Sequence, residues 1–143
     1  MTQSAETPHT AISPNQTSEL THLSAVELAQ AIRLGELSAV EVVEAHIRRC
    51  QDVHSRLNAL VAPRFDEARH EAAAVDADRA AVRPLGPLAG VPITIKEQFY
   101  LRGTQATIGI TRFVGQQTPE EGPLVARLRQ PAPSFWVRRT CRN

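Results

Sequence analysis

The stretch that decides the fold of this chain is residues 86–97, Gly-Pro-Leu-Ala-Gly-Val-Pro-Ile-Thr-Ile-Lys-Glu. Its first five residues are punctuated by glycine and proline and predict a loop, since such a segment cannot be helical. The β-branched run over residues 91–95 predicts a buried strand, with Pro92 at its start or at a sheet edge because proline donates no backbone hydrogen bond. Lys96 would then lie at the C-terminal end of the strand, where open α/β sheets place their active-site residues.

Two sequence signals upstream of this strand predict helices. Ser24 and Ser38 are each followed three residues later by a glutamate, which is the spacing of a capping box at the start of a helix. Gly35 provides a stop signal for the first helix. We therefore expect helices near residues 25–34 and 39–54.

The remaining elements have weaker signals. Residues 57–62 fit either a short strand or the end of the preceding helix, and the alanine-rich residues 66–81 predict a surface helix with a weak apolar stripe. Residues 103–115 are typical of a loop. A threonine followed by proline and two glutamates, residues 118–121, predicts the start of a last helix.

Composition divides the chain into three segments. Residues 1–18 are polar and almost free of apolar side chains, so we expect a disordered N-terminal segment. Residues 19–130 carry the helix and strand signals and form the folded part. Residues 131–143 have no acidic residue, contain the only tryptophan and show no helix or strand period, so we expect no stable packing there.

The composition also excludes several classes of protein. A formal net charge of +1 provides no overall field that would recruit nucleic acid or an anionic membrane. No apolar run in the sequence approaches the roughly 20 residues that span a bilayer. The two cysteines, Cys50 and Cys141, do not have the spacing of a disulfide framework or a zinc site. We expect a cytoplasmic protein with no membrane or nucleic-acid partner.

The sequence contains no complete motif for binding a cofactor or a metal ion. The segment before Lys96 resembles a phosphate-binding loop, but Ile95 and Glu97 occupy the positions that require Gly and Ser or Thr. His70 and the glutamate after it begin like a zinc-binding H-E-x-x-H motif, yet Ala74 stands at the second histidine position. We therefore expect no cofactor and no bound metal.

Lys96 is the only lysine among 16 basic residues, the others being arginine. A lysine at a strand end can be a solvated terminus whose ammonium group reaches water. Beside a buried strand it would instead lose hydration, its pKa would fall, and its neutral amine could accept a proton, which an arginine cannot do. The residue pattern alone leaves both interpretations open.

The stretch over residues 86–97 resembles the G-P-L-x-G-[IV]-P-[ILV]-x-[IV]-K-[DE] segment of the amidase signature family. The similarity continues through Gly103-Thr104, Ala106-Thr107 and Gly109, and upstream through residues 37–43 and 57–59. This resemblance implies an α/β fold, namely the N-terminal part of an α/β/α structure with a mixed central sheet, represented here mostly by helices and by one or two strands.

The resemblance also implies a mechanism. Amidase signature enzymes use a Ser–cis-Ser–Lys triad, and Lys96 matches its lysine, which relays a proton so that a serine can attack an amide carbonyl. Both serines normally follow in a Gly/Ser-rich segment, and this chain has no such segment. We therefore expect an amide-hydrolysing enzyme that is truncated before both serines and inactive on its own, with a small-molecule amide as the substrate of the full-length enzyme.

The last 13 residues, 131–143, depart from the family's usual continuation. Codons can be chosen for them that, read two nucleotides later, spell Gly-Ala-Ile-Leu-Leu-Gly-Lys-Thr-Asn-Val-Pro-Glu, which is that continuation. The third bases are chosen to fit, but the second glycine is forced by the tryptophan codon and the one after it. Our hypothesis is the loss of one nucleotide just after the codon for Gln130. The alternative is an unrelated natural tail.

Two other functions remain open from the sequence. The chain could be a piece of the glutaminase subunit of a tRNA-dependent amidotransferase, a member of the same family. It could also be a noncatalytic interaction domain whose helices bind a partner. A cooperatively folded monomer or a stable complex favours the interaction domain, whereas part of a larger core should expose apolar surface and aggregate.

Overall fold

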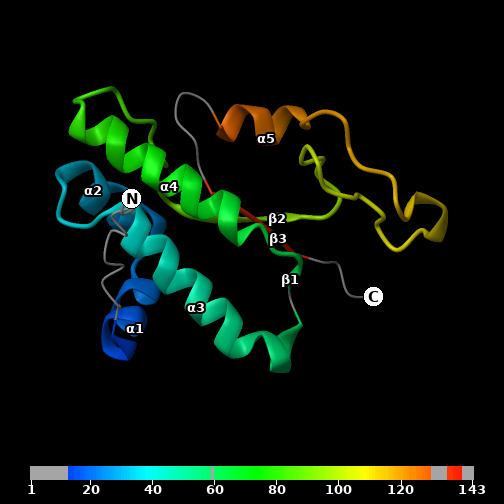
Figure 1. Ribbon diagram of the computed structural model, residues 1–143, viewed down its shortest axis with the longest axis horizontal. Coiled ribbons are helices and arrows are strands. Elements are labelled where there is room, and N and C mark those ends of the chain that lie inside the picture. Colours follow the sequence, from blue (N-terminus) through cyan, green and yellow to red (C-terminus); the bar gives the residue numbers. More distant parts are fainter. Residues whose placement is uncertain (1–12, 59, 130–134, 140–143) are drawn as a thin grey trace, which may run out of the picture.

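The computed structural model describes residues 13–58, 60–129 and 135–139 (Figure 1). In chain order its elements are α1 (Pro14–His22), α2 (Ala25–Leu34), α3 (Ala39–Leu57), β1 (Leu60–Ala62), α4 (Phe65–Ala80), β2 (Pro92–Lys96), a short 3-10 helix η1 (Thr111–Phe113), α5 (Pro123–Leu128) and β3 (Phe135–Arg139).

Helices α2, α3 and α4 form the larger of two hydrophobic cores. Ile32 on α2, Val42 on α3 and Val75 on α4 are fully buried in it, together with Val91 at the approach to β2. We call residues 14–91 the helical region. The predicted bounds of α2 are confirmed, and α3 runs three residues beyond the expected 54 before Asn58 caps it in a left-handed conformation.

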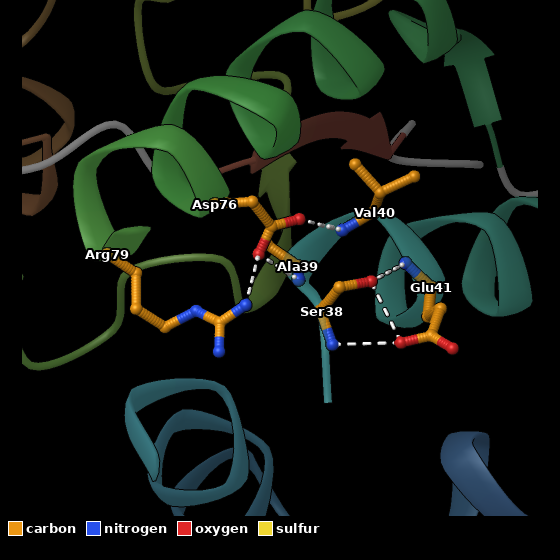
Figure 2. A network of polar contacts seen from close by, with 6 residues as sticks. All are labelled: Ser38, Ala39, Val40, Glu41, Asp76 and Arg79. Atoms are coloured by element: carbon orange, nitrogen blue, oxygen red, sulfur yellow. Dashed lines mark hydrogen bonds and ion pairs between the residues drawn. The ribbon is translucent and has the colours of Figure 1, made fainter. Parts of the chain in front are cut away.

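The starts of α2 and α3 are fixed by the capping boxes that the sequence predicts. In each, the serine oxygen accepts a hydrogen bond from the backbone N–H of the glutamate, whose carboxylate accepts from the serine N–H. Helix α3 gains a second cap from α4, because Asp76 accepts from the N–H groups of Ala39 and Val40 at 2.8 and 3.1 Å (Figure 2). These bonds satisfy N–H groups that a helix start otherwise leaves unpaired.

The expectation that α4 lies on the surface is wrong for one of its faces. Ala68, Ala72 and Val75 are buried against the core that α4 shares with α2 and α3. The apolar stripe is weak because it is built mainly of alanines, and small side chains allow a close approach to α3. Burial here follows from the contact between the helices and not from large hydrophobic side chains.

The N-terminal boundary also differs from the expected one. Residues 1–12 lie outside the described part, but residues 14–18, which we expected to be disordered, begin α1. This helix packs against α3. Thr17 is buried, and the hydroxyl of Thr21 donates to the carbonyl of Thr17 at 2.9 Å. Threonine hydroxyls that bond to the preceding turn make a polar sequence compatible with a helix.

The sheet is mixed, as the fold class requires, and has three strands in the order β1-β3-β2 where one or two were expected. Strand β3 lies in the middle, antiparallel to β1 and parallel to β2. The expectation that residues 131–143 have no stable packing is therefore wrong for Phe135–Arg139; residues 131–134 and 140–143 lie outside the described part. Strand pairing uses backbone groups, so an aromatic and β-branched stretch can fill this position whatever its origin.

The last expected helix starts later than the sequence signal suggests. Helix α5 begins at Pro123 with Gly122 as its N-cap, and not at residues 118–121. Thr118 closes the preceding loop, because its hydroxyl donates to the carbonyls of Leu101 and Thr104. We call residues 92–129 the strand–loop region; its loop extends away from α1–α4 (Figure 1, yellow).

Candidate active site

Lys96 is the last residue of β2, and its side chain is exposed. Strand β2 packs through Ile95, which is buried against Leu101 and Val125 in the second, smaller core. Directly after the strand the chain turns, with the N–H of Phe99 donating to the carbonyl of Lys96 at 3.0 Å. Among the described residues no carboxylate forms an ion pair with Lys96. Its side-chain nitrogen therefore has no ion-pair partner among the described residues, and the residue is exposed at the strand end.

Strand β2 is less buried than expected. Only Ile95 among its five residues is buried, whereas Thr94 and Lys96 are exposed. The strand lies at one edge of the described sheet, paired with β3 alone. This arrangement leaves one hydrogen-bonding edge of β2 unpaired within the described residues.

Glu97 is the residue of this site that sequence reasoning missed. Its side chain is buried, with 5% relative exposure, and its Oε1 accepts hydrogen bonds from the N–H of Thr107 at 2.9 Å and from the N–H of Ile108 at 3.1 Å. The Thr107 hydroxyl donates to the same oxygen at 2.5 Å. The available signal was an acidic residue directly after an apolar strand, since a buried carboxylate needs hydrogen-bond donors and threonine and glycine loops supply them.

Further bonds close the loop between β2 and α5. Thr118 donates its backbone N–H to the carbonyl of Thr104 at 2.8 Å, and Gly103 donates to the carbonyl of Thr118 at 3.1 Å. The hydroxyl of Thr104 reaches the carbonyl of Leu101 at 2.7 Å. Thr104 and Thr118 are buried, so these polar bonds and not a large apolar core give the loop its shape.

The loop that follows β2 forms a hollow of about 460 Å³. Its wall includes Phe99, Tyr100, Ile108 and Phe113, and Gln98 and Thr118 contribute polar groups. Phe99, Tyr100 and Ile108 are among the exposed large hydrophobic side chains of the chain. An apolar hollow with a few polar groups is the usual form of a small-molecule site, and here it starts two residues after Lys96.

The described residues supply no nucleophile beside Lys96. Their serines, Ser13, Ser18, Ser24, Ser38 and Ser55, belong to α1, α3 and the segments that begin or precede helices, and none lies between Lys96 and residue 129. No group of three or more His, Cys, Asp or Glu side chains that could hold a metal ion is found within residues 13–58, 60–129 and 135–139. None of the helices in this part of the chain has the length and apolar character needed to cross a membrane.

Two of the titratable groups with shifted pKa values are His46 and Glu71 of the helical region. Burial lowers the pKa of His46 on α3, against the opposing effect of its hydrogen bond to the carbonyl of Val42. Burial also raises the pKa of Glu71 on α4, an effect that the nearby Arg129 opposes. Arg129 follows α5 and bonds to Glu71 at 3.2 Å, so this pair ties the strand–loop region to the helical region.

Comparison with known proteins gives a consistent result. The family model described as Amidase matches residues 41–138. The chain is 43% identical over 111 residues to a glutamyl-tRNA(Gln) amidotransferase subunit from Salinispora arenicola, a match covering 78% of this chain and 23% of the relative. It is 44% identical over 107 residues to an indoleacetamide hydrolase from Bradyrhizobium diazoefficiens, covering 75% and 20%.

Solved structures agree with the sequence relatives. A fatty acid amide hydrolase superposes with a TM-score of 0.81 and 29% identity, over 90% of this chain and 22% of that protein. The chain thus spans less than a quarter of the length of these relatives. The residues that the family model matches, 41–138, include β2 and the loop that follows it.

Proposed function

Because this chain belongs to the amidase signature family, we propose that it forms the N-terminal part of an enzyme that hydrolyses carbon–nitrogen amide bonds, with Lys96 as the base of its catalytic site. One observation carries the proposal: the only lysine of the chain is the last residue of β2 and lies inside the segment that the family model matches. Open α/β sheets place reactive groups at this end of their strands. The Lys96 side chain is exposed among the described residues, so the loss of hydration that a base needs would have to come from the part of the domain that follows residue 130.

The proposed chemistry is that of a Ser–cis-Ser–Lys triad. A serine hydroxyl is a weak nucleophile, so it needs a base that removes its proton as it attacks the amide carbonyl. The neutral amine of Lys96 would accept that proton through the second serine and later return it to the leaving amine. Water would then hydrolyse the acyl–serine ester. Both serines belong to the part of the family's domain that follows residue 130.

We expect the 143-residue chain to hydrolyse no amide by itself, because the described residues after Lys96 contain no serine for it to activate. Restoring one nucleotide after the codon for Gln130 and letting translation continue should give a product with a Gly/Ser-rich segment and with amidase activity. A restored frame that encodes no such segment, or a longer product that cleaves no amide, would count against the proposal. Turnover by the unextended chain that survives repurification would contradict the expected inactivity.

The substrate class is open to a direct test. Identity to the amidotransferase relative and to the indoleacetamide hydrolase is nearly equal, 43% and 44%, so it favours neither. Release of ammonia from glutamine, measured beside release from an arylacetamide, separates the two functions in the longer product. If both amides stay intact and the 143-residue chain is a stable, cooperatively folded monomer, a noncatalytic interaction domain is the better account.

A further inference from the structure

Lys96, the last residue of β2, and Glu97, which directly follows the strand, lie in different environments. Lys96 is exposed, whereas Glu97 has only 5% of its surface accessible. A carboxylate is costly to bury unless donors surround it. Here the donors described for Oε1 all come from one short turn, the N–H and hydroxyl of Thr107 and the N–H of Ile108. Glu97 therefore connects the strand end to a turn ten residues further along the chain.

The turn that Glu97 holds is in an unusual conformation. Ile108 has a φ of +44°, in the left-handed region, and Gly109 follows at +80°. A β-branched residue rarely adopts a positive φ, because its branched Cβ crowds the backbone. Such conformations persist where the surrounding contacts over-determine them, and they are enriched at functional sites. Here the hydrogen bond from the Ile108 N–H to the Glu97 carboxylate is the contact that holds Ile108 at a positive φ.

The turn places Ile108 on the wall of the hollow whose lining begins at Gln98, two residues after Lys96 in the chain, and which Phe99 and Tyr100 also line. We propose that Glu97 is a positioning residue: its carboxylate holds the turn over residues 107–109 so that the wall of the hollow keeps a fixed place relative to Lys96. This inference rests on the proposed function for its catalytic meaning. The contacts of Glu97 with the turn can be tested without any catalysis.

The first test measures amide hydrogen exchange, by NMR on the 143-residue chain or, where that chain aggregates, by mass spectrometry on the longer product. Replacing Glu97 with glutamine removes the charge but keeps the size of the side chain. Glutamine still offers an oxygen acceptor, so exchange at Thr107 and Ile108 should accelerate by about five- to tenfold, the factor that corresponds to replacing a charged acceptor with a neutral one. Exchange at Thr118, whose N–H donates to Thr104, should change much less. Glu120→Gln, an exposed carboxylate of the same loop, is the matched control and should change neither.

A suppressor variant separates positioning from general stabilisation. Glycine adopts positive φ without strain. If Glu97 acts by holding Ile108 left-handed, Ile108→Gly should reduce the loss in urea midpoint caused by Glu97→Gln, so the two changes should not be additive. Additive losses, or unchanged exchange at residues 107 and 108, would overturn the proposal. Thr107→Val, which removes only the hydroxyl bond, gives a milder variant for the same comparisons should Glu97→Gln not fold.

The catalytic consequence is measured in the longer, active product. Glu97→Gln should lower kcat by about tenfold or more while the protein stays folded, and Ile108→Gly should restore part of the loss, because a misplaced wall costs rate through poor alignment. A fully active Glu97→Gln enzyme would overturn the positioning role even if the turn is loosened. The two proposals fail separately: an enzyme that tolerates Lys96→Arg refutes the base, whereas the contact between Glu97 and the turn is judged by exchange alone.

Discussion

The helical region and the strand–loop region are stabilised in different ways. Among the described residues, the former buries a continuous core of twelve residues from α2, α3, α4 and the segment leading to β2. In the same part of the chain the latter has a smaller core around three buried residues, Ile95, Leu101 and Val125. Its loop instead depends on Glu97, Thr104 and Thr118, whose polar groups bond to nearby backbone. The helical region is therefore stabilised mainly by apolar packing. The strand–loop region, which carries the candidate site, depends more on individual hydrogen bonds.

The largest expected effect is in the helical core. Ile32→Ala should destabilise the whole chain by about 2–5 kcal/mol, because Ile32 is fully buried and its removal leaves a cavity. Leu101→Ala, equally buried in the small core, should open the strand–loop region while α2–α4 stay protected. Urea unfolding combined with residue-resolved amide exchange checks both. Loss of protection throughout the chain in Leu101→Ala would remove the distinction between the two regions.

The next largest loss of stability is expected from replacing a glycine that has a positive φ and a close neighbour. Gly90 joins the two regions with φ of +78°, and a Cβ there would come within 2.8 Å of the Ala39 Cβ. Gly90→Ala should therefore cost about 2–4 kcal/mol, from backbone strain and from overpacking together. Gly103→Ala is the matched control, since its φ is +75° but a Cβ would meet nothing within 4 Å. It should cost only about 1 kcal/mol from the backbone. Equal losses in thermal unfolding would show that packing at Gly90 is loose.

Asp76 should have a smaller effect that is confined to the helical region. Asp76→Ala removes the acceptor for two N–H groups at the start of α3 and should cost about 1–2 kcal/mol. Asp78→Ala removes an ion pair with the exposed Arg83 and should cost no more than about 1 kcal/mol. Chemical denaturation of both variants measures the difference. Similar losses would mean that the hydrogen bonds that Asp76 accepts at the start of α3 (Figure 2) contribute no more stability than an exposed ion pair.

The smallest expected effect is a pH dependence from His46. Burial lowers its pKa below the ordinary 6.5, so the unfolded chain binds more protons as the pH falls below that value. Stability from this group is therefore complete above pH 6.5 and is lost as the pH falls through the lowered pKa. The unfolding free energy of His46→Gln, followed from pH 7.5 to 5.5, should fall less than that of the unchanged chain. Parallel curves would mean that His46 titrates alike in both states.

The sequence predicts the helical region well because its signals are local. Capping boxes at Ser24 and Ser38 fix two helix starts within one short segment each, and both are confirmed. Thr118 shows why the strand–loop region is harder to predict. Its pattern is that of a helix cap, yet in the fold its hydroxyl finds the carbonyls of Leu101 and Thr104, 17 and 14 residues away in the sequence.

The partners of Glu97 lie ten and eleven residues away, and no periodicity marks them. Strand β3 was likewise missed because its place depends on partners from β1 and β2, which composition does not reveal. Lys96 could be singled out because it is the only lysine and follows an apolar run. Its surroundings could not be predicted, since they depend on tertiary contacts.

The central claim is that Lys96 acts as a base and is not a solvated strand end. Its most direct test is kcat/KM of Lys96→Arg in the product translated beyond residue 130, with Arg102→Lys as the control in the neighbouring loop. Arginine keeps the positive charge but stays protonated, so it cannot accept a proton. We predict a loss of about a thousandfold or more with folding unchanged, since members of a triad act as a unit. Activity within about tenfold of the unchanged enzyme would contradict the account, because enzymes lose about a hundredfold or more when a proton-transfer group is removed.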